Sequence, residues 1–277
     1  MAVGFNVKEV TMKSYICFPG GKFKVLTMSY DDGKLEDRRL ISIFNKYGIR
    51  GTFHLNSDAL TQDIRIHEDE IPSLYAGHEV ACHTLTHPTI AREPIALVAH
   101  EVLEDRKNLE RITGHMVRGL SYPNGSYSDE IKALLPLLGI KYSRIVGNSD
   151  GFALPTDLYE WKATCHHNHN LLELGQQFCD LTKKQYLYMM YVWGHSYEFT
   201  KDDNWDLMEQ FCSMMGGRED IWYATNIEYV DYMEAAHRLI YSADASVVFN
   251  PSAASVWISV NNEPAIEIPG GATVSLA

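Results

Sequence analysis

The fold class follows from residues 24–55, KVLTMSYDDGKLEDRRLISIFNKYGIRGTFHL. KVLTMSY (24–30) is typical of a buried strand, and it ends in the polar turn Asp31-Asp32-Gly33. LEDRRLISIFNKYG (35–48) has the apolar spacing of an amphipathic helix closed by Gly48, and RGTFHL (50–55) is a second strand. A strand, a helix and a strand in this order predict parallel strands joined by a crossover.

The same alternation continues along the chain. We expect further strands at 78–83, 116–122, 140–145, 185–194 and 221–225, and helices at 93–114, 128–139, 203–217 and 226–240. From residue 244 onward short β-rich runs follow one another with no helix between them. The sequence therefore predicts an α/β domain over residues 1–243 and a small antiparallel β appendix over residues 244–277. We expect a structural role for this appendix, with carbohydrate binding as the alternative.

Length, charge and cysteine content limit the possible functions. A chain of 277 residues fits one α/β barrel or two average domains. The net charge of −12 argues against a nucleic acid or an anionic membrane as partner. Five scattered cysteines without a CxxC pair indicate reduced thiols. With no secretory signal and no apolar run long enough to span a membrane, we expect a cytoplasmic protein, although a secreted chain without its signal would look the same.

Three polar clusters follow predicted strands, where α/β folds place their sites. In the first, one of the adjacent residues Asp31 and Asp32 could bind a metal while the other faces the substrate, although Asp-Asp-Gly is also good turn chemistry. In the second, His83 and His87 precede Pro88, which excludes a helix. Two histidines and a carboxylate make a plausible site for a divalent ion, with surface histidines as the alternative. In the third, His195 follows an apolar strand and is either structural or catalytic.

Two of these clusters carry family motifs. Ser29 to Gly33 match Thr/Ser-aromatic-Asp-Asp-Gly, and His83, Thr84 and His87 match His-Ser/Thr-x-x-His. Together, and at this spacing, they resemble the NodB-homology polysaccharide deacetylases, the fourth family of carbohydrate esterases, over roughly residues 24–240. The resemblance implies a distorted, incomplete (β/α) barrel.

The resemblance also implies a role for each matching residue. One divalent metal ion is expected, with zinc favoured and cobalt, nickel or manganese as alternatives. The implied metal ligands are Asp32, His83 and His87, the implied general base is Asp31, and the implied general acid is His195. Thr84 is implied to brace the loop by a hydrogen bond, and the backbone N–H at Asn124 to bind the oxyanion. Trp161 is implied to line a sugar subsite, with a buried core position as its alternative.

The sequence departs from the family pattern at the third motif. The family has an arginine there that orients the catalytic aspartate, whereas this chain has Ser121. Arg118 should face the opposite way on the strand and is not expected to replace it. Three further features have no family counterpart: His54, the tract Cys165 to His169, and Glu198. Glu198 could either orient His195 or face solvent.

These features lead to one expected activity with two alternatives. We expect a hydrolase that removes N- or O-linked acetyl groups from a sugar or oligosaccharide, with no nucleic acid or membrane partner. The alternatives are an amide hydrolase for a non-sugar substrate and a non-catalytic carbohydrate-binding relative. The sequence leaves the oligomeric state open.

Overall fold

The computed structural model describes residues 12–276, which form two compact units. Lys24–Asp231 make up the larger unit, and the smaller unit contains residues 12–23 and 232–276. The boundary at 243/244 stays a prediction, and the structure groups the C-terminal strands with residues 12–23.

The larger unit is built on a parallel sheet. The strands are ordered β7-β6-β5-β4-β3-β2-β9-β8, with β10 also paired to β2, and each of these pairings is parallel. Every residue of β2 is buried, as expected for a strand covered on both faces. This arrangement confirms the predicted incomplete (β/α) barrel. The strands are β2 (Lys24–Asp31), β3 (Gly51–Leu55), β4 (Glu79–Cys82), β5 (Gly119–Ser121), β6 (Tyr142–Asn148), β7 (Trp161–Ala163), β8 (Cys165–His166), β9 (Tyr188–His195) and β10 (Ile221–Tyr223).

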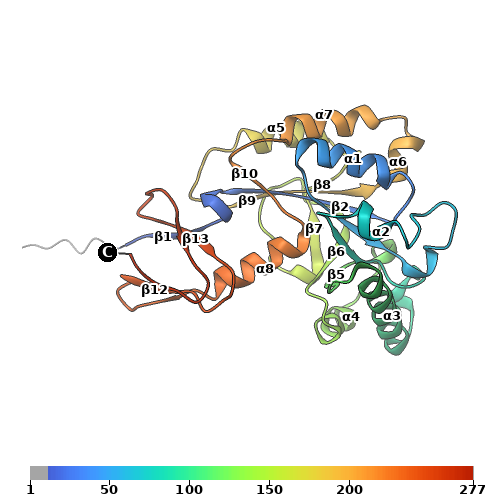
Figure 1. Cartoon of the computed structure of the whole chain (residues 1–277), viewed down its shortest axis with the longest axis horizontal. Coiled ribbons are helices and arrows are strands. Elements are labelled where there is room, and N and C mark those ends of the chain that lie inside the picture. Colours follow the sequence, from blue (N-terminus) through green and yellow to red (C-terminus); the bar gives the residue numbers. More distant parts are fainter. Residues whose placement is uncertain (1–11, 277) are drawn as a thin grey trace, which may run out of the picture. The chain divides into compact units, whose positions relative to one another are not determined.

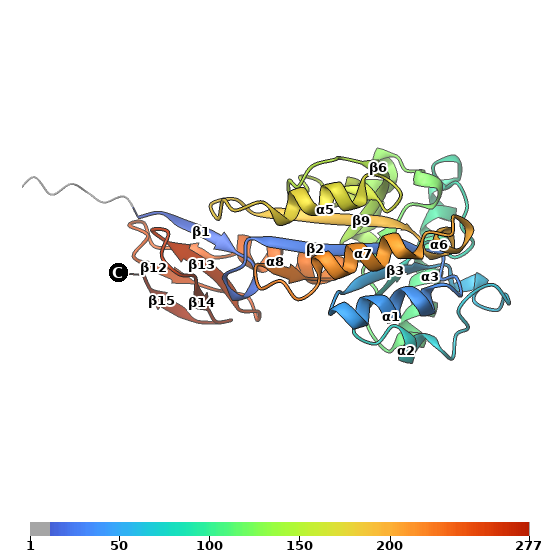
Figure 2. The same ribbon diagram turned by 90° about the horizontal axis from the view of Figure 1, so that it is seen from above.

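Helices cover both sides of this sheet. Figure 1 shows α1, α5 and α7 together on one side and α3 and α4 on the opposite side, and in Figure 2 α7 lies between α1 and α5. Gly48 ends α1 at a φ of 67°, as its sequence position predicted. The helices are α1 (Asp37–Tyr47), α2 (Ile71–Leu74), α3 (Ile95–Thr113), α4 (Asp129–Leu134), α5 (Leu171–Cys179), α6 (Ser196–Lys201), α7 (Trp205–Met215) and α8 (Asn226–His237), of which α8 runs into the smaller unit.

The smaller unit contains two antiparallel sheets of three strands each. β1 (Ser14–Cys17) pairs with β13 (Val256–Val260), which pairs with β14 (Ile266–Ile268). The second sheet has the order β11-β12-β15. The buried side chains of Val248, Ile258 and Ile268 form a small core. The antiparallel strands predicted at the C-terminus are confirmed, whereas β1 was missed because its partner lies over 200 residues away in the sequence. The second sheet comprises β11 (Ile240–Tyr241), β12 (Val247–Phe249) and β15 (Thr273–Ser275).

All five cysteines lie among the described residues, are buried and form no disulfide. No helix within residues 12–276 is long and apolar enough to span a membrane.

Candidate metal centre and active site

Two neighbouring carboxylates, Asp31 and Asp32, lie at the C-terminal end of strand β2. Asp31 is the last residue of the strand and is 3% exposed, whereas the Asp32 side chain is 15% exposed. Asp32 has a φ of 82°, and Thr84 (φ 64°) and His87 (φ 63°) in the histidine motif also have left-handed backbone conformations. Such conformations are costly for residues other than glycine and concentrate at functional sites. Both motifs therefore carry backbone strain at the same place.

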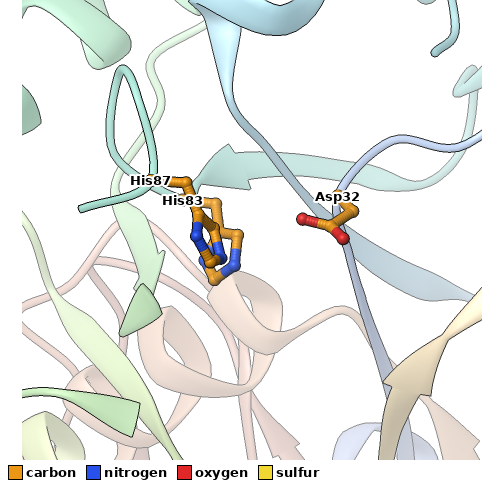
Figure 3. Close-up of side chains that lie close together, drawn as sticks. All are labelled: Asp32, His83 and His87. Atoms are coloured by element: carbon orange, nitrogen blue, oxygen red, sulfur yellow. The ribbon is translucent and has the colours of Figure 1, made fainter. Parts of the chain in front are cut away.

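Asp32, His83 and His87 come together as the sequence predicted. Their potential ligand atoms all lie within 4.8 Å of one another, and the two imidazole ring centroids are 4.7 Å apart. Figure 3 shows the two rings side by side, with the Asp32 carboxylate facing them from the end of β2. Two histidines and one carboxylate form a donor set suited to a catalytic first-row metal with open positions.

The hydrogen bonding of His83 fits a metal ligand. Its Nδ1 lies 2.8 Å from the carbonyl oxygen of Ser121. A carbonyl oxygen can only accept a hydrogen bond. Nδ1 therefore carries the ring proton, and the Nε2 lone pair is left for a cation. Burial lowers the pKa of His83 to about 4, so the ring is neutral near pH 7, as a ligand must be.

Backbone contacts from neighbouring elements hold the histidine loop. The Asp105 carboxylate accepts a hydrogen bond from the His83 N–H at 3.0 Å, and Asn56 Nδ2 donates to the carbonyl oxygens of His83 and Thr84. Glu101 accepts the backbone N–H of Thr86 at 2.8 Å. The Thr84 hydroxyl is buried and has no hydrogen-bond partner among the described residues. The bracing hydrogen bond expected from the Thr84 side chain was therefore wrong, because Asn56, Asp105 and Glu101 hold the loop by its backbone instead.

An arginine on strand β6 contacts Asp31. Arg144 on β6 is the register partner of Ser121 on β5, and its guanidinium forms a buried ion pair with Asp31 Oδ2. Arg144 Nε also donates to Ser29 Oγ at 3.2 Å, and its guanidinium lies 4.5 Å from the ring centroid of Trp193. Sequence reasoning missed Arg144 because the third motif drew attention to one strand only.

Asp31 is consequently held from two sides and ionised. Ser121 Oγ donates to Asp31 Oδ1 at 3.0 Å, while Arg144 binds the other oxygen. Burial acts to raise the pKa of Asp31, but the Arg144 guanidinium and the nearby histidines outweigh it and hold this pKa well below its usual range. Arg118 forms a separate ion pair with Asp231 at 2.6 Å, so the prediction that it does not replace the missing arginine is confirmed.

His195 lies level with Asp31 on the adjacent strand. The two residues are register partners of β9 and β2, and the His195 side chain is 23% exposed. Glu198 accepts the His195 backbone N–H at 3.0 Å, and its Oε2 also lies 3.3 Å from Nδ1 of that ring. Burial acts to lower the pKa of His195, but the Glu198 and Asp31 carboxylates outweigh it and raise this pKa above its ordinary value. Glu198 therefore orients His195, one of the two options left open by the sequence.

Two more histidines reach the same carboxylate oxygen. His166 Nε2 lies 3.1 Å and His167 Nε2 lies 3.4 Å from Glu198 Oε2, which could suggest a second metal site. The backbone N–H of Asn168, however, donates to His166 Nδ1 at 3.1 Å. The ring proton of neutral His166 is then on Nε2, where it points at Glu198 and leaves no lone pair for a cation. The 165–169 tract thus supports Glu198 rather than forming a metal site.

The remaining expected residues have mixed outcomes. Trp161 is 1% exposed and packs against the rings of Tyr142, Tyr191 and Tyr229. The expected sugar subsite at Trp161 was therefore wrong, because the ring has no accessible face. Asn124 is exposed with a φ of 56°, and its role in binding the oxyanion stays a prediction.

One further residue stays without a function. His54 is fully buried, its Nδ1 lies 3.2 Å from the Cys82 carbonyl oxygen, and its Nε2 has no hydrogen-bond partner among the described residues. Burial lowers the pKa of His54 to about 3, which keeps this ring neutral.

Comparison with known proteins finds a family model that matches part of this chain. The sequence profile of the family described as polysaccharide deacetylase matches residues 19–143. This segment contains both metal-ligand motifs and ends directly before Arg144, so His195 and Glu198 lie outside it. Among curated proteins, none matches this sequence.

Solved structures with low sequence identity are similar to this chain, and the fold is shared with two of them. A Mycobacterium smegmatis protein, which is named as a polysaccharide deacetylase, is 15% identical with a TM-score of 0.60, over 81% of this chain and 95% of that chain. A Bacillus anthracis pseudoenzyme of the CE4 family is 18% identical with a TM-score of 0.52, over 78% of this chain and 68% of that chain. A Streptococcus pyogenes deacetylase, PplD, solved with acetate, is 16% identical with a TM-score of 0.46, over 48% of this chain and 61% of that chain.

Proposed function

We propose that this chain is a metal-dependent hydrolase that removes acetyl groups from a carbohydrate, because residues 19–143 match the polysaccharide deacetylase family. The observation that carries this proposal is the convergence of two motifs and one further strand end. Asp31 and Asp32 from β2, the histidine pair that follows β4, and His195 from β9 are brought to one edge of the parallel sheet.

Asp32, His83 and His87 are the residues that would hold the metal ion. The donor set and the ring proton of His83 on Nδ1 both fit a divalent first-row ion. When bound, such an ion supplies Lewis acidity toward the acetyl carbonyl and lowers the pKa of water. We favour zinc. Cobalt, nickel and manganese are alternatives, because a His/His/Asp set accepts several of these ions.

The other site residues move protons at defined atoms. Asp31 is ionised, and Arg144 and Ser121 fix its two oxygens, so it can accept a proton from the attacking water as general base. His195 keeps a protonated fraction near neutral pH because the carboxylates around it raise its pKa. It can therefore protonate the departing nitrogen or oxygen as the C–N or C–O bond breaks.

Two alternatives remain distinguishable by experiment. The first alternative, a hydrolase for a non-sugar amide, would use the same residues. The second is a non-catalytic carbohydrate-binding protein, and one protein of similar fold is a pseudoenzyme. Retention of Asp31, Asp32 and both motif histidines supports catalysis here. Acetate release should be measured on a panel of N- and O-acetylated sugars with Zn, Co, Ni and Mn. Release from N-acetylated amides only, without a sugar, would favour the amide hydrolase, and no release would favour the binding protein.

Loss of one metal ligand is expected to weaken metal binding strongly. The His87→Ala protein should bind Zn²⁺ more weakly by more than the ~10–100-fold typical of losing an outer-shell partner, since a direct ligand is removed. Calorimetric titration of chelator-stripped protein with Zn²⁺ measures this change. His100→Ala, an exposed histidine on α3, is the matched control and should bind as the wild type does. Wild-type Zn²⁺ affinity in His87→Ala would refute the ligand assignment.

Glu198 is expected to control the alkaline side of the pH profile. The carboxylate raises the pKa of His195, so general-acid activity is present at low pH and is lost as pH rises through that pKa. In Glu198→Gln the pKa of His195 should fall, and the alkaline limb of kcat should move to lower pH. Activity at pH 8 should then fall more than activity at pH 6. Glu173→Gln, an exposed glutamate on α5, serves as control. An unmoved alkaline limb in Glu198→Gln would contradict the role given to this residue.

A further inference from the structure

The side chain of Arg65 contacts both the backbone and the side chain of the metal-ligand candidate Asp32. Its Nη1 donates a hydrogen bond to the backbone carbonyl oxygen of Asp32 and lies 3.4 Å from Oδ1 of the same residue. Both side chains are largely buried. The left-handed backbone of Asp32 is costly for a residue other than glycine, and it persists only where surrounding contacts hold it. One guanidinium therefore holds the candidate ligand at two points.

The backbone around Arg65 is fastened to the turn that carries Asp32. The Ile66 N–H donates to the carbonyl oxygen of Gly33 at 2.8 Å, and Lys34 and Arg65 form an antiparallel β-bridge. Ile66 is fully buried and anchors this segment in the core. None of these contacts uses the Arg65 side chain, so a substitution there should leave the segment beside the turn.

On the metal site that the proposed function assumes, we propose that Arg65 is a positioning residue for the metal ligand Asp32. The guanidinium engages Oδ1, so Oδ2 is the oxygen left to bind the ion, and Asp32 ligates through one oxygen rather than two. A carboxylate held in this way leaves more positions of the ion open to water and substrate than a bidentate carboxylate does. Arg65 thus acts through Asp32 and not on the substrate.

Arg65 also places a permanent positive charge beside the candidate ligand. An arginine side chain stays protonated throughout the working pH range, and a largely buried charge is poorly screened by salt. This charge repels a divalent cation that shares the same carboxylate, so we expect Arg65 to lower the affinity of the site for metal. Loss of the brace should matter less than loss of the repulsion, because the Asp32 N–H still donates to the His54 carbonyl oxygen at 2.9 Å. The benefit is reactivity, since an ion with fewer anionic donor atoms around it is a stronger Lewis acid.

Metal titrations of Arg65 variants test this inference without any substrate. Chelator-stripped protein is titrated with Zn²⁺ against a chromophoric chelator, and the visible ligand-field bands of the Co²⁺-loaded protein are recorded. These bands weaken as the coordination number of Co²⁺ rises. In Arg65→Met the Kd for Zn²⁺ should fall by about tenfold, since the repulsive charge is gone. The Co²⁺ bands should weaken, since Oδ1 of Asp32 is then free to join the ion. Arg65→Lys, which keeps the charge, should restore a Kd close to that of the wild type.

Arg111→Met is the matched control. Arg111 forms an ion pair with Glu68 in which both side chains are exposed, so its loss should change neither the Zn²⁺ affinity nor the Co²⁺ spectrum. Should Arg65→Met fail to fold, Arg65→Gln removes the charge but keeps a hydrogen-bond donor, and the same gain in Zn²⁺ affinity is expected of it.

The two readouts are decisive in either direction. Unchanged or weaker Zn²⁺ binding by Arg65→Met overturns the inference, as does an unchanged Co²⁺ spectrum or a gain in affinity that Arg65→Lys shares in full. Acetate release tests the proposed function separately, because the titrations contain no substrate. A wild-type protein that binds Zn²⁺ but releases no acetate from the sugar panel would defeat the proposed function and leave the role of Arg65 standing.

Discussion

Replacing Asp31 by Asn is expected to lower kcat on acetylated sugars by ~10²–10⁴ while the protein still binds one metal ion. The amide is nearly isosteric with the carboxylate. Its oxygen can accept from Arg144 and its NH2 group can donate to the Ser121 hydroxyl, so the site should keep its shape. It cannot accept a proton from water, because its oxygen is far less basic. Steady-state kinetics together with metal analysis of the purified protein measure both properties.

Asp32→Asn is the matched comparison, one residue along the chain. Asp32 is the carboxylate that converges with His83 and His87, so this substitution should weaken metal binding directly. The two neighbours are thus expected to separate by function. If Asp31→Asn empties the metal site while Asp32→Asn retains the ion, the assignment of base and ligand is reversed.

Replacing Arg144 by Met should both destabilise the protein and disable the base. Removal of one partner of a buried ion pair typically costs about 3–5 kcal/mol, since the other charge stays buried without compensation. Asp31 would lose the cation that holds its pKa low, and burial would then raise that pKa. The acid limb of kcat/KM should therefore move to higher pH. Chemical denaturation and a pH–rate profile measure the two effects.

The chain supplies a matched control for this substitution. Arg118 forms an ion pair with Asp231 in which the Asp231 side chain is 45% exposed. Exposed pairs contribute only about 0–1 kcal/mol, so Arg118→Met should change stability little and leave the pH profile in place. Should Arg144→Met fail to fold, Arg144→Lys keeps the charge but loses the planar fork, and its pH profile can be measured instead. A wild-type acid limb in Arg144→Met would show that Arg144 does not tune Asp31, whereas Arg144→Lys, which keeps the cation, should shift the limb less.

The sequence by itself determined the elements and the metal-ligand candidates. β2, α1 with its Gly48 cap, and β3 follow from residues close together in the chain, because strand alternation, helix period and a left-handed cap are local properties. The candidate ligands were predictable for the same reason. Asp32 belongs to a turn at the end of one strand, and His83 and His87 lie in one loop after another strand. In a parallel sheet both strand ends lie at the same edge, which brings the three residues together.

Only the tertiary structure decided what surrounds the base and the acid. Arg144 reaches Asp31 because β6 pairs with β5 in one particular register, and a shift by one residue would turn its side chain to the other face of the sheet. Trp161 is buried because three tyrosines from other elements surround it. His166 and His167 were ambiguous until a backbone N–H located the ring proton of His166. These outcomes depend on contacts between strands far apart in the chain, and strand register and ring protonation are not encoded in any short stretch of sequence.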